Sequence, residues 1–402
     1  MQYSYAKRMQ QVRASEIREL LKLTQSPEII SFSGGLPSPE LFPIEAIKNA
    51  CMSVLTENGR EALQYSTTEG YAPLRRWVAE RMNCRLGTHF GEDEILLTHG
   101  SQQAIDLAGK VFLDEGDVVL CESPTYLAAL SAFRLFGCRF IEVPTDDDGM
   151  VPEELEKILE TETRIKLIYT IPEFQNPTGR SWSLERKKEL IALATRHNIV
   201  VLEDNPYGEL RFEGDPIPSA AAFDTIGNVM CLGTFSKIFC PGYRIGWIAG
   251  SRELIDKFVM VKQGTDLQCN TIGQYEIAEY LKSYDIDSHI DKIREDYRKK
   301  RDIMLETMDK FFPDGVSYTR PSGGLFGWVT LPENMDARKL LVECLKEKVA
   351  FVPGGSFFPN GGHQNTLRIN FSYATEEQLR EGIRRIARVL VQSIDGPIRS
   401  EA

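Results

Sequence analysis

Short apolar runs alternate with helical patterns through the middle of the chain. After the first run, for example, Ala104, Ile105, Ala108 and Val111 recur at helical spacing. Apolar runs that alternate with helices predict a mainly parallel sheet covered by helices on both faces. Ligands bind such sheets just beyond the carboxyl ends of the strands, so the polar residues after each run are candidates for a site. The predicted strands span residues 94–98, 117–121, 139–143, 166–171, 199–202, 229–232 and 245–249.

The pattern changes near residue 285. A long charged helix is expected over 289–312, and a final helix begins at Thr375, which forms a capping-box pattern with Gln378. The segments between them are two expected strands, 325–331 and 367–372, and one expected helix, 337–348. We therefore expect an α/β fold with a large sheet domain and a smaller α+β domain. The predicted division is an N-terminal arm (1–45), a large domain (46–285) and a small C-terminal domain (286–402).

Composition and charge exclude several classes of protein. A hydrophobic content of 42% and a charged content of 26% are typical of a globular protein, and a net charge of −11 argues against a nucleic-acid partner. There is no signal-peptide pattern and no stretch near the roughly 20 apolar residues of a membrane span. Eight cysteines occur without a Cys-x-x-Cys pair, and five histidines occur without metal-ligand spacing. We expect a cytoplasmic protein in a reducing compartment, with no metal and no membrane or nucleic-acid partner.

Lys237 follows small hydroxyl residues at the end of an apolar run, and Arg244 follows a Pro-Gly turn seven residues later. A lysine amine in such a place is a candidate for carbonyl chemistry, beside an anion-binding cluster of Thr234, Ser236 and Arg244. A phosphorylated aldehyde cofactor would use both halves of this segment. The alternative is an ordinary lysine on a surface loop.

Two further polar residues follow apolar runs. Asp204 ends the run at 199–202, where a partly desolvated carboxylate needs a cationic partner such as a protonated pyridine nitrogen. Its alternative is a helix N-cap or turn aspartate. Asn176 begins Asn-Pro-Thr-Gly (176–179), which is a turn signal, although an amide at a strand's carboxyl end is also able to hydrogen-bond a cofactor oxygen.

Two more segments suggest anion binding. Residues 100–103 open a helix directly after a strand, where free N–H groups and the helix dipole favour a phosphate. Neither a G-x-G-x-x-G fingerprint nor a P-loop occurs. Arg368 lies on the polar face of an alternating strand, where it would pair with a substrate carboxylate or, alternatively, lie on an exposed sheet face.

The order of these segments resembles that of class I aminotransferases of pyridoxal-phosphate fold type I. The resemblance covers about residues 10–392, and residues 17–24, 64–71 and 351–355 are most similar to the 2-aminoadipate/kynurenine branch, in particular the bacterial 2-aminoadipate aminotransferases of lysine biosynthesis. The segments that carry it are Gly-Gly-Leu-Pro (34–37), Gln-Tyr-Ser (64–66), Gly-Ser-Gln-Gln (100–103), Asn-Pro-Thr-Gly (176–179), Glu-Asp-Asn-Pro-Tyr (203–207), Ser-Lys (236–237), Pro-Gly-Tyr-Arg (241–244) and Leu-Arg-Ile-Asn (367–370).

The resemblance implies roles around the ring of a pyridoxal 5′-phosphate cofactor. Lys237 bonds to the cofactor aldehyde and later moves a proton from the substrate Cα. Asp204 keeps the pyridine nitrogen protonated, which lets the ring accept electrons. Asn176 and Tyr207 hydrogen-bond the ring hydroxyl oxygen, and Tyr126 stacks on the ring.

The resemblance also implies how the two anionic ends are held. The phosphate is bound by Ser101, Gln102, Thr234, Ser236 and Arg244, with Tyr65 from a second subunit. Many relatives carry serine where Thr234 stands, but the hydroxyl is retained. Arg368 takes the substrate α-carboxylate, with Gly35 and Asn176 beside it. A homodimer with shared active sites is implied.

The expected activity is transfer of an amino group from an L-amino acid to 2-oxoglutarate by a ping-pong mechanism. Arg18 lies at the edge of the apolar face of a helical pattern over 17–24 in the arm. In the adipate-type relatives an arginine at the matching position meets the side-chain carboxylate of acidic substrates. We therefore expect a 2-aminoadipate or glutamate preference, with aromatic or aliphatic substrates tolerated through a lid helix in the arm. The alternative for Arg18 is a solvated helix arginine.

Two other functions remain open from the sequence. One is a pyridoxal-phosphate β-lyase or decarboxylase on the same fold. The other is a non-catalytic regulator, which is disfavoured because the chain begins in the arm without a basic DNA-binding module.

Overall fold

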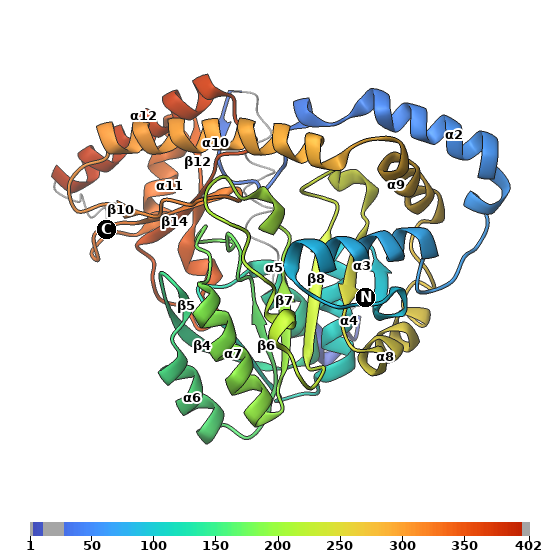
Figure 1. Ribbon diagram of the computed structural model, residues 1–402. Helices are drawn as coiled ribbons and strands as arrows, with labels where there is room; N and C mark the ends of the chain where they lie inside the picture. Colours follow the sequence, from blue (N-terminus) through green and yellow to red (C-terminus); the bar gives the residue numbers. More distant parts are fainter. Residues whose placement is uncertain (1–2, 11–27, 396–402) are drawn as a thin grey trace.

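The chain folds around a large sheet and a smaller sheet that lie next to each other, with long helices over the smaller one (Figure 1). The computed structural model describes residues 3–10 and 28–395. Within these residues the large sheet has eight strands and the smaller sheet has four. The expectation of an α/β fold with a second, smaller sheet is confirmed.

The central strands of the large sheet run parallel. β4, β3, β6, β7 and β8 pair in parallel, whereas β9 and β5 run antiparallel to their neighbours. All residues of β2, β8 and β9 are buried, because helices cover both faces. The strands lie in the order β2 (Ile95–Thr98), β9 (Gly246–Ala249), β8 (Val229–Thr234), β7 (Val200–Asp204), β6 (Ile165–Thr170), β3 (Val118–Ser123), β4 (Arg139–Asp146) and β5 (Gly149–Met150).

Helices follow the strands and pack on the two faces of this sheet. In Figure 1, α3 and α7 lie in front of the sheet and α4 lies behind it. Their apolar residues recur at helical spacing and form one core with the strands, as the periodicity predicts. These helices are α3 (Ala72–Leu86), α4 (Gly100–Phe112), α5 (Leu127–Phe133), α6 (Pro152–Thr161), α7 (Leu184–His197), α8 (Arg252–Gln263) and α9 (Thr271–Ser283).

The smaller sheet is antiparallel and is covered by three helices. The expected capping box at the last helix is present, since Thr375 N–H donates to Gln378 Oε1 and Gln378 N–H donates to Thr375 Oγ1. The sheet consists of β10 (Ser317–Tyr318), β11 (Phe326–Thr330), β14 (Thr366–Asn370) and β13 (Val352–Pro353). The helices are α10 (Ile286–Phe311), α11 (Ala337–Lys346) and α12 (Glu376–Asp395), of which α10 and α12 pack along each other.

The N-terminal segment crosses to the smaller sheet before the large one begins. β1 (Ile30–Ser31) pairs in parallel with β12 (Val349–Ala350), and α2 (Ile44–Ala62) then extends away from both sheets (Figure 1). This path carries residues 33–37 between the two sheets. Among the helices of the described residues, none is both long enough and apolar enough to span a bilayer.

Gly179 lies where the loop after β6 meets the smaller sheet. Its φ is +72°, and a Cβ atom there would overlap the carbonyl oxygen of Phe326 in β11. Gly361 has a similar φ of +85°, but nothing lies within 4 Å of the position of its Cβ. The two glycines share the same backbone requirement and differ in crowding.

We predict that Gly179→Ala destabilises the protein more than Gly361→Ala. Both substitutions strain a left-handed residue by about 1–3 kcal/mol, and only the first adds overlap with backbone. Urea unfolding of both variants measures the difference. Equal losses of unfolding free energy would contradict a close contact between the two sheets at Gly179.

Candidate functional site

A cavity of about 330 Å³ opens at the carboxyl ends of β6, β7 and β8, facing β11 and β14 of the smaller sheet. All the predicted site residues except Tyr65 and Arg18 line it. They are Gly35, Ser101, Gln102, Tyr126, Asn176, Asp204, Tyr207, Thr234, Ser236, Lys237, Arg244 and Arg368. Most of these residues converge because the parallel strands of the large sheet end at one edge, whereas Arg368 comes from the smaller sheet and Gly35 from the N-terminal segment.

Asp204 is the last residue of β7 and is only 2% exposed. Tyr169 on the neighbouring strand β6 donates its hydroxyl to Asp204 Oδ2 at 2.8 Å. Among the described residues, no group hydrogen-bonds the other oxygen, Oδ1. Burial raises the pKa of this carboxyl to about 7, although the Tyr169 bond lowers it. Asp204 is therefore not a helix cap, and its free Oδ1 fits a protonated ring nitrogen.

Lys237 lies in the cavity and not on a surface loop. Its Nζ donates to the carbonyl oxygen of Gly35 at 2.8 Å. Burial, and then the positive charges of Arg244 and Arg368, lower the pKa of this amine to about 8. Near neutral pH a fraction of the amine is therefore uncharged, as a nucleophile or a base requires.

One end of the cavity is suited to an anion. Thr234 Oγ1 lies 2.9 Å from Ser236 Oγ and accepts the Ser236 N–H at 3.1 Å. Ser101, in the first turn of α4, also lines the cavity, and the first N–H groups of a helix have no partner within the helix. Gly100 has a φ of +70°, and a Cβ atom there would lie 2.8 Å from Arg244 Nη2. The glycine thus allows the guanidinium to approach the helix start, and the donors together fit a phosphate.

Arg368 is 2% exposed and also lines the cavity. It donates to Asn176 Oδ1 and to the Ser33 carbonyl oxygen, both at 2.7 Å, and its guanidinium lies 4.3 Å from the centre of the Phe326 ring. Its Nε has no hydrogen-bond partner among the residues described. Burial lowers the pKa of Arg368 to about 10.

The alternative that Arg368 lies on an exposed sheet face is therefore wrong. Every residue of β14 is buried, because α10 and the N-terminal segment cover what the alternation predicted as a polar face. A buried guanidinium with a free donor fits a ligand carboxylate.

Two tyrosines, Tyr126 and Tyr207, also line the cavity. Tyr207 is 5% exposed and hydrogen-bonds the side chain of Asn176. Burial raises the pKa of Tyr207 far above its usual value and that of Tyr126 to about 12. Both phenols thus remain protonated donors at neutral pH.

Two predicted residues are not part of this cavity. Tyr65 is 78% exposed and does not line it. Arg18 lies outside the described residues. Conversely, Tyr169 was missed, because it belongs to an apolar run that predicts only core. Phe326, whose ring contacts the Arg368 guanidinium, was missed for the same reason. Only the pairing of strands places Tyr169 next to Asp204 and Phe326 next to Arg368.

The chain matches the family described as "Aminotransferase class I and II" over residues 27–386, a range that includes every cavity residue. It is 45% identical over 387 residues to aromatic-amino-acid aminotransferase 1 of Thermococcus litoralis, which covers 95% of this chain and 93% of that relative. It is also 45% identical over 390 residues to the 2-aminoadipate transaminase of Thermus thermophilus, which covers 96% of each chain.

A solved structure is similar over almost the whole fold. The kynurenine aminotransferase of Pyrococcus horikoshii, in complex with PMP, superposes with a TM-score of 0.94 at 43% identity, covering 98% of each chain. The segments that carry the cavity residues thus lie within a fold that this chain shares with the solved aminotransferase over almost its whole length.

We predict that the ligand-free protein captures pyridoxal with a pH midpoint near 8, well below the usual 10.5 of lysine, because the Lys237 amine must lose its proton to react. Arg244→Gln should raise this midpoint, since it removes a positive charge that favours the neutral amine. Reductive trapping and mass spectrometry of the peptide around residue 237 give the profile, with Lys237→Ala as the blank. A wild-type midpoint near 10.5 would contradict the buried amine.

Proposed function

The chain belongs to the aminotransferase class I and II family, whose members use pyridoxal 5′-phosphate, and we propose that it moves the amino group of an acidic L-amino acid to 2-oxoglutarate. One observation carries the proposal. The cavity holds the Lys237 amine, the free oxygen of Asp204 and the buried guanidinium of Arg368 together. These are a nucleophile, a partner for a ring cation and a carboxylate clamp.

In the proposed mechanism each of these residues has one task. When bound, pyridoxal 5′-phosphate supplies an aldehyde and a ring that takes up negative charge from the substrate Cα. Asp204 Oδ1 holds the proton at the ring nitrogen. Lys237 Nζ accepts the proton from the substrate Cα, which its pKa of about 8 suits near neutral pH. Arg368 holds the α-carboxylate and so orients the Cα–H bond.

The remaining cavity residues are proposed to hold the cofactor. Asn176 and Tyr207 would bind its ring oxygen, Tyr126 would cover the ring, and residues of the first turn of α4 together with Arg244 would hold the phosphate. The phosphate residues are Ser101, Gln102, Thr234, Ser236 and Arg244. Amino acids and 2-oxo acids both carry the carboxylate that Arg368 binds, so they use one cavity in turn, in a ping-pong scheme.

The proposed substrate class rests on charge. The cations that line the cavity from the described residues are Lys237, Arg244 and Arg368, and each has a task already. A side-chain carboxylate needs a further cation, which we propose is Arg18. Leu36 and Phe326 add apolar wall, which suits tolerance of aromatic or aliphatic side chains. The relatives at 45% identity, one named for aromatic amino acids and one for 2-aminoadipate, are consistent with both.

We also propose a homodimer in which Tyr65 serves the partner's cavity. Apolar side chains are exposed along α2 and the loop after it, with Met52 at 63%, Leu63 at 69% and Tyr65 at 78%. Exposed apolar groups of this kind mark interfaces. All eight cysteines are free thiols, which supports a cytoplasmic location. The division into an arm (1–45), a large domain (46–285) and a small domain (286–402) remains part of the proposal.

The central test is a panel of L-amino donors incubated with 2-oxoglutarate and the holoenzyme. We predict glutamate in equal amount to the donor consumed, with 2-aminoadipate among the best donors. Lys237→Ala should reduce turnover by about 10²–10⁴-fold or more, since it removes the base. Ammonia with pyruvate, formed from one donor without 2-oxoglutarate, would instead establish a β-lyase. Carbon dioxide release would establish a decarboxylase.

The acidic preference has its own test. Arg18→Ala should raise KM for 2-aminoadipate and glutamate by about tenfold or more and leave KM for leucine unchanged, because only the acidic side chains lose a charged hydrogen bond. Steady-state kinetics with Arg8→Ala, an exposed arginine of the same segment, provide the control. An equal rise in KM for leucine and for glutamate would contradict the proposed role of Arg18.

A further inference from the structure

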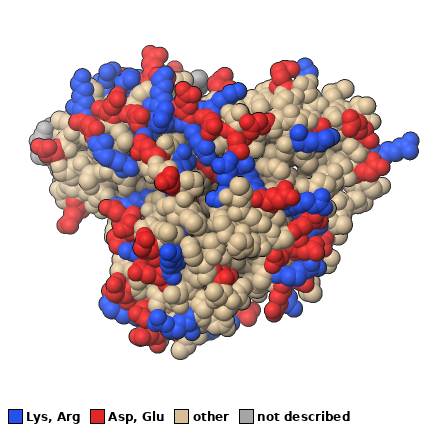
Figure 2. Space-filling model, viewed as in Figure 1, with Lys and Arg blue, Asp and Glu red and all other residues tan. Residues whose placement is uncertain are grey.

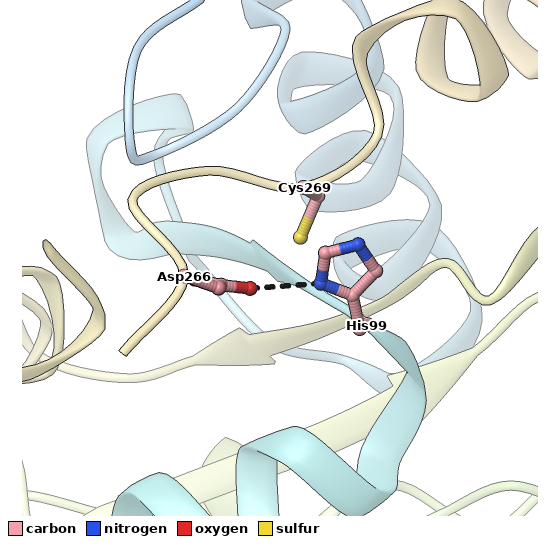
Figure 3. A group of neighbouring side chains, drawn as sticks. All are labelled: His99, Asp266 and Cys269. Carbon is pink, nitrogen blue, oxygen red and sulfur yellow. Dashed lines mark hydrogen bonds and ion pairs between the residues drawn. The ribbon is translucent and has the colours of Figure 1, made fainter. Parts of the chain in front are cut away.

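Three side chains of the kinds that bind metal ions lie close together next to the start of α4, outside the cavity. Figure 3 shows His99, Asp266 and Cys269 directed toward one another. Their ligand atoms lie within 4.8 Å of each other. Each is already used, however: His99 Nδ1 lies 2.8 Å from Asp266 Oδ2, the Asn270 N–H donates to His99 Nε2 at 3.4 Å, and Cys269 Sγ donates to the Leu97 carbonyl oxygen at 3.3 Å.

Asp266 is the centre of this group, and a protein cation already compensates it. Lys262 is fully buried, and its Nζ lies 2.7 and 2.8 Å from the two Asp266 oxygens. Gln103 Nε2 donates to Asp266 Oδ2 at 2.5 Å. Burial alone would raise the pKa of Asp266, but the bonds from Lys262 and Gln103 hold it below its usual value. The carboxylate is therefore ionised and satisfied, and a metal would have to displace the ammonium.

The network holds the residues that begin α4. His99 is the N-cap residue of that helix, and its N–H donates to Gln103 Oε1 at 2.8 Å. Asp266 thus binds the side chain of the N-cap residue and also the amide that caps its backbone. Arg244 Nη2 donates to the His99 carbonyl oxygen at 3.5 Å, so the same turn meets the arginine of the anion end.

We propose that Asp266 is a positioning residue for phosphate binding. Through His99 and Gln103 it holds the first turn of α4, so that the free N–H groups next to Ser101 face the cavity at a constant place. The proposal rests on the proposed function, since it takes the phosphate to bind at this turn. Asp266 itself does not line the cavity and does not touch the ligand.

The test compares two aldehydes that differ only in the phosphate. Full-length protein freed of cofactor is titrated with pyridoxal 5′-phosphate and with pyridoxal, and both Kd values are measured by absorbance. Asp266→Asn should raise the Kd for pyridoxal 5′-phosphate about tenfold and change the Kd for pyridoxal less than about twofold. At saturating cofactor, KM for the amino donor should stay unchanged.

Asp117→Asn is the matched control. Asp117 is also a buried aspartate in an ion pair, with Arg164 at 2.9 Å, but it lies before β3, away from the carboxyl ends of the strands. This variant should lower the melting temperature without changing the ratio of the two Kd values. If Asp266→Asn does not fold, His99→Gln is the second variant. It removes the imidazole contacts with Asp266 and with the Asn270 N–H, keeps the contact between Asp266 and Gln103, and should change the ratio in the same direction.

The outcomes separate the two proposals. A lower melting temperature of Asp266→Asn with an unchanged Kd ratio would overturn the positioning role and leave the proposed function intact. Failure of the wild-type protein to bind pyridoxal 5′-phosphate more tightly than pyridoxal would overturn the proposed phosphate site itself.

Discussion

One electrostatic imbalance organises the cavity: the buried carboxylate of Asp204 has a partner at only one of its two oxygens among the described residues. Burying a carboxylate is unfavourable unless a cation or several hydrogen bonds compensate it. Its raised pKa of about 7 expresses this deficit. Lys237 and Arg368 are perturbed in the same cavity in the opposite direction, because burial disfavours their charged forms. A cofactor with a ring cation and an aldehyde, together with a substrate carboxylate, would relieve all three.

The cavity depends on contacts between the two sheets. Arg368 comes from the smaller sheet and bonds Asn176, which follows a strand of the large one. The N-terminal segment supplies the carbonyl oxygens of Ser33 and Gly35 to Arg368 and Lys237. These carbonyl groups accept the same donors that a substrate carboxylate or a cofactor aldehyde would engage. Binding of a ligand therefore replaces hydrogen bonds within the protein by hydrogen bonds to the ligand.

The network around Asp266 differs from the cavity, because its polar groups already have partners within the protein. Its carboxylate has bonds from Lys262 and Gln103, and the imidazole of His99 is engaged at both nitrogens. A fully satisfied polar network stiffens the structure around it, whereas a buried polar atom without a partner is energetically unfavourable. The two aspartates thus differ in how completely their oxygens are bonded within the described residues: Asp204 ends strand β7, and Asp266 lies between α8 and α9.

The sequence by itself determined the alternation of strands and helices, because apolar periodicity reflects burial. It also determined that Asp204, Asn176 and Lys237 gather at one edge of the sheet, because parallel strands end at the same edge. It did not determine the contact of Tyr169 with Asp204, because strand register decides which side chains meet. The burial of Arg368 on both sides also arises only when distant segments cover β14. The pairing of His99 with residue 266 is likewise tertiary, because no local pattern links positions 167 residues apart.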